Sequence, residues 1–196
     1  MSTLKCYFEG RKELFKGLAI DKLEKDRNLY PVLHLSFGGQ NFVEPYTLDK
    51  VLEQFVARAE QAYGRDPLAL TLTSRFQSAL HYAHVKTGLK AVVLIDEYDK
   101  PLLDVMDMDI HVKNEYGKMS LEDYNRNLLK GFYSVFKDAD ADLRFVLLTG
   151  VTKFSQVSVF CGFNQPDNIS LDERYEALCG VTEEELYTVL ADSIKA

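Results

Sequence analysis

The spacing of apolar residues in the first half of the chain predicts two strands separated by two helices. Residues 30–37 alternate between two sets of side chains, as a strand does, and the glycines at 38–39 end the run. Between 47 and 63 apolar residues recur at helical spacing instead, and a second helical stretch covers 74–86. Residues 91–95 are all apolar, the pattern of a strand that is buried on both faces.

The second half of the chain continues this alternation. Residues 104–118 are mostly polar and are predicted to form a mobile loop. Ser120 is expected to cap a helix, with Asp123 near the position of a capping-box partner, and residues 143–148 read as another buried strand. A final helix is predicted to begin at Thr182. Strands that alternate with helices indicate an α/β fold with a parallel sheet, and we expect one domain over the whole chain because no linker is apparent.

The composition places the chain among soluble, cytoplasmic proteins. With 23 Lys and Arg against 30 Asp and Glu, its formal net charge is −7, which argues against a surface that cradles nucleic acid as a whole. The three cysteines, Cys6, Cys161 and Cys179, are odd in number and widely separated, so they predict neither a disulfide framework nor a zinc site. No apolar run approaches the ~20 residues of a membrane span, and the first residues lack the apolar core of a signal peptide.

Two predicted strands end in residues that could carry out chemistry. In an open parallel sheet, sites form beyond the carboxyl ends of the strands. Asp96 and Glu97 directly follow the buried run, where an aspartate can reach a Mg²⁺ ion and a glutamate can polarise an attacking water. Thr149 follows the other strand and could sense a γ-phosphate. The plainer alternatives are a carboxylate that begins a solvated loop and a threonine that caps a turn with Gly150, and for Thr149 the pattern alone favours the plainer one.

Several segments of the chain, in a fixed order, resemble a known family. They are Tyr7-Phe8-Glu9-Gly10 with Leu14-Phe15-Lys16-Gly17-Leu18, Ile95-Asp96-Glu97-Tyr98-Asp99-Lys100-Pro101-Leu102, Leu147-Leu148-Thr149-Gly150-Val151-Thr152-Lys153-Phe154, and Asn168-Ile169-Ser170-Leu171-Asp172-Glu173-Arg174-Tyr175 with Cys179-Gly180. Together they resemble the predicted AAA-ATPase-like family. That resemblance covers nearly the whole chain and favours a Walker-B function for the acidic pair.

The resemblance implies a three-layer P-loop NTPase fold of the AAA or STAND type, with ATP and Mg²⁺ as its ligands. It implies that Asp96 associates with Mg²⁺, that Glu97 activates the attacking water and that Thr149 acts as the sensor. Lys153 and Arg174 are the matching candidates for cations that face the phosphates. Longer members often carry a nuclease-like PD-(D/E)XK domain, and only such an appended domain is expected to bring nucleic acid to the protein.

One departure from the family pattern limits these expectations. No GxxxxGK[ST] motif occurs in the sequence, so the backbone amides and the lysine that hold phosphates are missing. Met1 falls where the family has just passed that loop, so we expect the first strand to be missing as well, through a late gene start, a fragment or a degenerate member. We therefore expect the chain to bind ATP weakly or not at all, and to expose a sheet edge through which two copies could dimerise.

Two rival functions remain beside the ATPase fragment. The first is a non-catalytic interaction module on a degenerate ATPase scaffold. The second is a metal-dependent nuclease, which would draw on the acidic residues that surround the strand end, namely Asp96, Glu97, Asp99, Asp104, Asp107 and Asp109. The acids beyond Glu97 are interpreted as a solvated charge run, and they lack the spacing that would place a lysine beside the metal.

The histidines carry weaker signals. His81 and His84 are three residues apart on a predicted helix and could share a face. Because no third ligand lies near them in the sequence, we interpret them as a surface or half-buried pair and not as a metal site. His34 lies within a predicted strand and is expected to have its hydrogen bonds satisfied.

Overall fold

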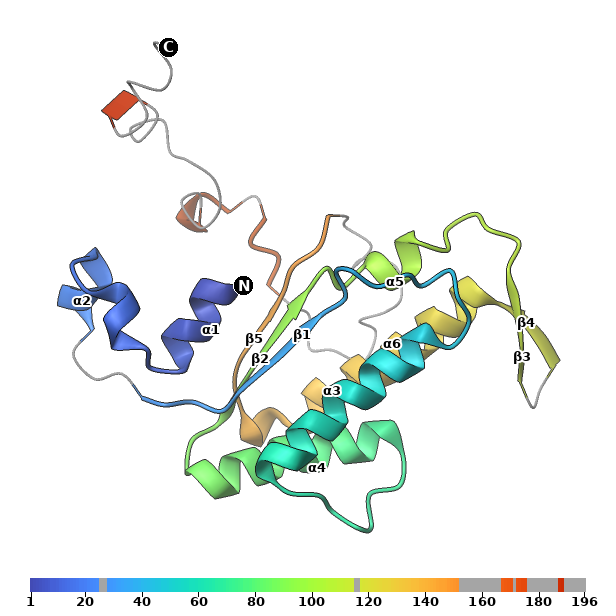
Figure 1. Ribbon diagram of the computed structural model, residues 1–196, viewed down its shortest axis with the longest axis horizontal. Helices are drawn as coiled ribbons and strands as arrows, with labels where there is room; N and C mark the ends of the chain where they lie inside the picture. Colours follow the sequence, from blue (N-terminus) through green and yellow to red (C-terminus); the bar gives the residue numbers. More distant parts are fainter. Residues whose placement is uncertain (25–27, 115–116, 152–166, 171, 176–186, 189–196) are drawn as a thin grey trace. The chain divides into compact units, whose positions relative to one another are not determined.

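The computed structural model describes residues 1–24, 28–114, 117–151, 167–170, 172–175 and 187–188 (Figure 1). The chain separates into two compact units, residues 1–163 and residues 164–196. In the second unit the structure describes one short 3₁₀ helix, η4 (Glu173–Tyr175). All the other elements below belong to the first unit.

A parallel sheet forms the centre of the first unit. Its strands are β1 (Val32–Ser36), β2 (Ala91–Asp96) and β5 (Leu143–Leu148), in the order β1-β2-β5. Both pairings are parallel, so the carboxyl ends of all three strands meet at one edge of the sheet. The prediction of an α/β fold with a parallel sheet is confirmed, and the strand with the longest apolar run lies in the middle.

Three helices cover one face of this sheet. They are α3 (Thr47–Tyr63), α4 (Leu72–Thr87) and α6 (Leu121–Asp138), which gather on the same side of the strands (Figure 1). Ala91, Val93 and Ile95 point into the core that these helices form. The spans predicted for α3, α4 and β5 agree with the structure to within two residues. Ser120 caps α6 by accepting a hydrogen bond from the Asp123 amide, as predicted.

Residues near the N-terminus form three short helices, and the first of them packs against the opposite face of the sheet. The three are α1 (Ser2–Phe8), the 3₁₀ helix η1 (Lys12–Phe15) and α2 (Ala19–Leu23). The ring of Phe8 lies 5.5 Å from that of Phe145 in β5 and 5.8 Å from that of Tyr30, measured between ring centroids. Phe145 pairs with Val92, one position away from the inward-facing Val93, so this aromatic contact lies on the face that the three long helices leave open.

The prediction of a mobile loop at residues 104–118 is wrong. The chain first forms α5 (Lys100–Leu103) and then an antiparallel hairpin of β3 (His111–Asn114) and β4 (Gly117–Ser120). Val112 pairs with Met119 across the hairpin and packs with Leu121 in a small second cluster. Single apolar residues spaced between polar ones were enough to build two short strands, because α6 supplies the surface on which they pack.

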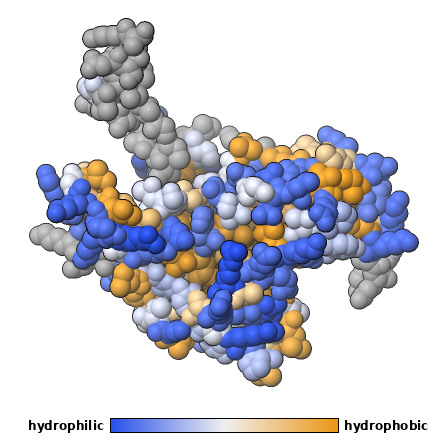
Figure 2. All heavy atoms as spheres, viewed as in Figure 1, coloured by the Kyte–Doolittle hydropathy of each residue, from blue (hydrophilic) through white to orange (hydrophobic). Residues whose placement is uncertain are grey.

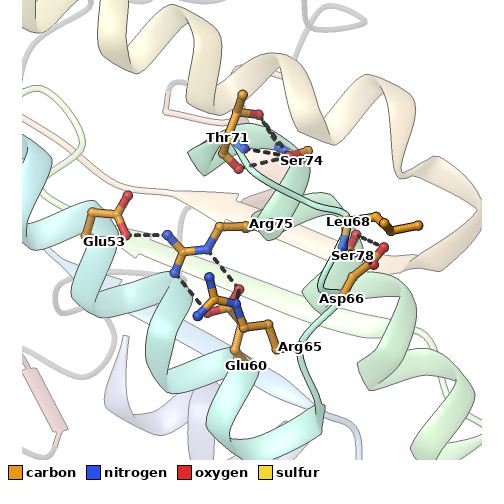
Figure 3. Close-up of polar contacts among 9 residues, drawn as sticks. All are labelled: Glu53, Glu60, Arg65, Asp66, Leu68, Thr71, Ser74, Arg75 and Ser78. Atoms are coloured by element: carbon orange, nitrogen blue, oxygen red, sulfur yellow. Dashed lines mark hydrogen bonds and ion pairs between the residues drawn. The ribbon is translucent and has the colours of Figure 1, made fainter.

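The helices α3 and α4 are joined by a network of ion pairs (Figure 3). Arg75 of α4 donates two hydrogen bonds to Glu60 of α3, at 2.9 and 2.8 Å, and a third to Glu53 at 2.5 Å. The side chains of Arg75 and Glu60 are only 12% and 8% exposed. The bonds from Arg75, more than any other effect, hold the pKa of Glu60 below its usual value. Figure 3 also shows the capping box between Thr71 and Ser74 that begins α4.

The face shown in Figure 2 carries hydrophilic and apolar groups side by side over much of its area. Among the exposed apolar side chains are Leu68 and Leu70 of the loop between α3 and α4. The 3₁₀ helix η2 (Asp140–Asp142) links α6 to β5. Of the helices in the described residues, none is long and apolar enough to cross a membrane.

Replacing Arg75 with alanine should destabilise the protein by about 2 kcal/mol, somewhat below the roughly 3–5 kcal/mol measured for fully buried pairs, because some solvent reaches this one. The remaining Glu60 would be a nearly buried carboxylate without its bidentate partner. Urea denaturation followed by circular dichroism measures this change. Arg58, an exposed arginine on α3, is the matched control, and Arg58→Ala should change stability by less than about 0.5 kcal/mol. Equal losses of stability in the two variants would contradict a stabilising role for the ion pair between Arg75 and Glu60.

Candidate functional site

The carboxyl ends of the three parallel strands are joined by hydrogen bonds that continue beyond the sheet. The Thr149 amide donates to the Ile95 carbonyl at 2.9 Å, and the Tyr98 amide donates to the Thr149 carbonyl at 2.9 Å. On the other side, the Phe37 amide donates to the Asp96 carbonyl at 3.1 Å. The turn that follows β2 is therefore fixed to both neighbouring strands, which gives its side chains defined positions.

Asp96 and Thr149 meet at this edge, although 53 residues separate them in the sequence. The Thr149 hydroxyl donates a hydrogen bond of 2.5 Å to Oδ1 of Asp96. Both residues are half-buried, at the point where the apolar strand β2 first reaches solvent. Such a bond orients the carboxylate of Asp96, and two of the residues singled out from the sequence are thereby brought into direct contact.

Glu97 lies on the other side of Asp96, toward β1. Its backbone adopts a φ of 55°, in the left-handed region that non-glycine residues rarely enter. A Cβ atom placed on Gly38 would lie 3.1 Å from Oε1 of Glu97 and 3.3 Å from Oγ of Ser36, so the lack of a side chain at Gly38 gives the carboxylate its space. The acidic pair is thus divided: Asp96 faces Thr149, and Glu97 extends over the end of β1.

Asp99 was missed by the sequence interpretation, which placed it in a solvated charge run. The residue is 1% exposed, and its Oδ2 accepts a hydrogen bond from the Val151 amide at 3.0 Å. Asp104 is also held, by the Lys100 ammonium at 2.7 Å and the Phe42 amide at 3.2 Å. The interpretation as a solvated run is wrong for Asp99 and Asp104. It fits Asp107 and Asp109, which are exposed.

His34 lies in β1, close enough to the site for the charge of Asp96 to act on it. Its Nε2 atom is buried and has no hydrogen-bond partner among the described residues, so the expectation of a satisfied histidine is wrong. Burial lowers the pKa of His34 most, and the positive charge of Lys5 lowers it further, against an opposing effect of Asp96. The neutral imidazole is the form that the folded protein favours.

The histidine pair on α4 has a partner that the sequence did not indicate. Nδ1 of His84 lies 2.7 Å from Asp142 in η2, and Nδ1 of His81 lies 3.3 Å from the same carboxylate. The fold brings this acid to the pair across 58 residues of sequence. This geometry gives the two histidines a structural role, because their contacts with Asp142 link α4 to η2.

Neither of the two candidate phosphate-facing cations belongs to the described residues of the first unit. Lys153 lies outside the described residues. Arg174 lies in the second unit, where its guanidinium donates to the Asp172 carboxylate at 2.6 to 3.1 Å. The roles assigned to these two residues stay predictions.

The strand ends fit a metal site of the Mg²⁺ type in part. Mg²⁺ keeps several waters and is usually bound by one or two carboxylates together with substrate phosphates. Asp96 would supply such a carboxylate, oriented by Thr149. Within the ranges described, no group of three His, Cys, Asp or Glu side chains is arranged to hold a metal ion.

The chain is similar in sequence to known proteins. A family model described as "Predicted AAA-ATPase" matches residues 1–160. The chain belongs to this AAA-ATPase-like family. A curated relative, the "Uncharacterized protein in vnfD 5'region" of Azotobacter chroococcum mcd 1, is 40% identical over 195 residues, which is 99% of this chain. The chain spans 36% of that relative's length. No solved structure matches the AAA-ATPase-like chain significantly.

The buried His34 should make the stability of the protein depend on pH. Its pKa is lower in the folded state than in the unfolded state, so the unfolded chain takes up the proton first as the pH falls. Stability is therefore retained above about pH 6.5, the ordinary value for histidine, and is lost as the pH falls below it. The urea midpoint of the wild type should drop between pH 7.5 and pH 5.5, and His34→Gln should reduce that drop. An unchanged pH dependence in His34→Gln would contradict this account.

Proposed function

We propose that Asp96, Glu97 and Thr149 form the metal-binding and water-activating half of an ATPase site. The observation that carries the proposal is the hydrogen bond from Thr149 to Asp96 at the carboxyl edge of the parallel sheet, where α/β proteins bind their ligands. Membership of the AAA-ATPase-like family supports the same chemistry.

In this proposal each of the three residues has one task. Asp96 holds Mg²⁺, directly or through a water, with the carboxylate orientation that Thr149 gives it. Mg²⁺, when bound, would neutralise charge on the phosphates of ATP. Glu97 is exposed and lies on the β1 side, where its carboxylate can accept a proton from an attacking water while Asp96 is occupied by the metal. Thr149 also lies where its hydroxyl could sense the γ-phosphate.

The phosphate-binding half of the site has no comparable support. The sequence contains no GxxxxGK[ST] motif, and the amides of such a loop are what normally surround the phosphates. We therefore propose that this chain alone binds ATP weakly and hydrolyses it negligibly. Lys153 and Arg174 remain the candidates for cations that approach the phosphates.

A second proposal, a non-catalytic interaction module, is favoured by the outer edge of β5. Among the described residues β5 pairs with β2 alone, and Phe145 of β5 is 38% exposed. Unpaired strand edges are templates for pairing with another chain, so two copies could dimerise here. This function would need neither the Asp96 carboxylate nor a metal.

Paramagnetic broadening by Mn²⁺, a substitute for Mg²⁺, tests the metal half even where binding is weak. Substoichiometric Mn²⁺ added to ¹⁵N-labelled protein should broaden the amide signals of Gly38, Glu97 and Gly150 before those of other residues. Asp96→Asn should abolish this selective broadening and spare any at Asp107 and Asp109, two exposed acids that serve as internal controls. Excess Mg²⁺ should reverse it. Broadening at the strand ends that persists in Asp96→Asn would overturn the role given to Asp96, and the lack of any selective broadening there would favour the interaction module.

Calorimetry with Mg²⁺-ATP tests the phosphate half separately. Without the phosphate loop, the dissociation constant of this chain should be weaker than about 1 mM, which corresponds to less than roughly 4 kcal/mol of binding free energy. Micromolar, Mg²⁺-dependent binding by the wild-type chain would show that other residues replace the loop, and would overturn the proposed weakness.

A further inference from the structure

Asp99 is a buried acid that the proposed chemistry does not use. We propose that it is a positioning residue, which holds the segment Thr149-Gly150-Val151 so that the Thr149 hydroxyl reaches Asp96. This inference rests on the proposed metal site, because it assigns Asp99 a role in orienting the ligand of that site. Asp99 would act through Thr149 and would not contact the metal itself.

The contacts of Asp99 place its carboxylate against the exit of β5. Oδ2 accepts the hydrogen bond from the Val151 amide at 3.0 Å. Oδ1 lies so close to Gly150 that a Cβ atom on this glycine would be 2.6 Å from it, and 2.7 Å from the Tyr98 ring. The chain therefore passes directly over the carboxylate, and only glycine fits at position 150 without displacing it.

The backbone of Asp99 is itself fixed by the short helix α5 and by α6. Asp99 directly precedes α5 as its N-cap residue, and its carbonyl accepts hydrogen bonds of 3.0 Å from the amides of Leu102 and Leu103. The buried side chain of Asn125 in α6 donates to the Pro101 carbonyl at 2.9 Å. Asp99 and Asn125 are the buried polar residues of the described chain, and both serve this short helix. Hydrogen bonds therefore connect the backbone of Asp99 to α5, and α5 to the core helix α6.

Thr149 lies between two fixed points as a result. On one side its backbone is bound to Ile95 and Tyr98, and on the other Val151 is bound to Asp99. With both sides fixed, the hydroxyl has a defined direction toward Oδ1 of Asp96. Without Asp99, the segment after Thr149 would lose its attachment, and the hydroxyl would meet Asp96 in only a fraction of the molecules.

The Mn²⁺ broadening experiment measures this effect directly. The neutral amide oxygen of Asn accepts the hydrogen bond from Val151 less strongly than the carboxylate does. Asp99→Asn should therefore weaken the apparent Mn²⁺ affinity at the strand ends by about fivefold, somewhat less than the roughly 10–100-fold found when a direct partner of a metal ligand is removed. Asp104→Asn is the matched control. Asp104 lies directly after α5 and also accepts a hydrogen bond from a backbone amide, but that amide belongs to Phe42 and lies away from the end of β5. The control should leave the affinity unchanged.

A double-mutant cycle separates positioning from general loosening of the fold. If Asp99 acts through the hydroxyl of Thr149, then Asp99→Asn should have no further effect on Mn²⁺ affinity in a Thr149→Val background. A purely structural role would instead lower the affinity equally in both backgrounds and would overturn the proposal. Should Asp99→Asn fail to fold, Gly150→Ala, which keeps the carboxylate but displaces the segment, should give the same fivefold loss and the same dependence on Thr149; no loss there would overturn it.

Failure of the inference and failure of the proposed function give different results. If Asp96→Asn leaves the broadening at the strand ends unchanged, the metal site itself is wrong, and the inference falls with it. If the broadening depends on Asp96 but Asp99→Asn behaves like Asp104→Asn, the metal site stands and Asp99 has no positioning role.

Discussion

The complete burial of the central strand is the constraint on which the rest of the structure depends. Residues 91–95 of β2 have no exposed surface, and strands pair with β2 on both sides. Burial of each such valine, leucine or isoleucine stabilises the fold by about 1.5–3 kcal/mol. A shift of the strand by one residue would turn its side chains to the opposite faces and move Asp96, its last residue, away from its position at the edge of the sheet. The hydrophobic effect therefore fixes where the first carboxylate of β2 can emerge, and hence where Thr149 must be to meet it.

Elements with strong local patterns could be predicted from the sequence, and elements that depend on distant contacts could not. The helix at 47–63 and the strand at 143–148 have the predicted bounds, because their apolar spacing alone selects the structure. The hairpin at 111–120 was missed because its short strands are stable only on the surface that Leu121 and its neighbours provide. The pairing of His81 and His84 with Asp142 is another contact that no local pattern contains.

The acids after β2 show the same limit at the level of single residues. Asp99 and Asp107 are the same residue type in one polar stretch, yet one is buried and the other exposed. The difference comes from Val151 and Asn125, which lie 52 and 26 residues away from Asp99 in the sequence and fix the short helix around it. Asp96 could be singled out because its position depends on the strand that precedes it. The burial of Asp99 depends on how three separate segments pack.

This packing also bears on the plainer interpretation of the acidic strand end. A carboxylate that merely begins a solvated loop needs no hydroxyl from a neighbouring strand, and the loop after it needs no buried acid. Burying a polar or charged group destabilises a fold unless hydrogen bonds compensate it, so a buried acid such as Asp99 is not expected in a turn that only has to be solvated. Here the bond from Thr149 to Asp96 and the bond from Val151 to Asp99 lie on either side of Gly150. Two carboxylates that hold three consecutive residues in this way fit a preorganised site better than a solvated turn, and they do so whether or not the phosphate half is supplied by this chain.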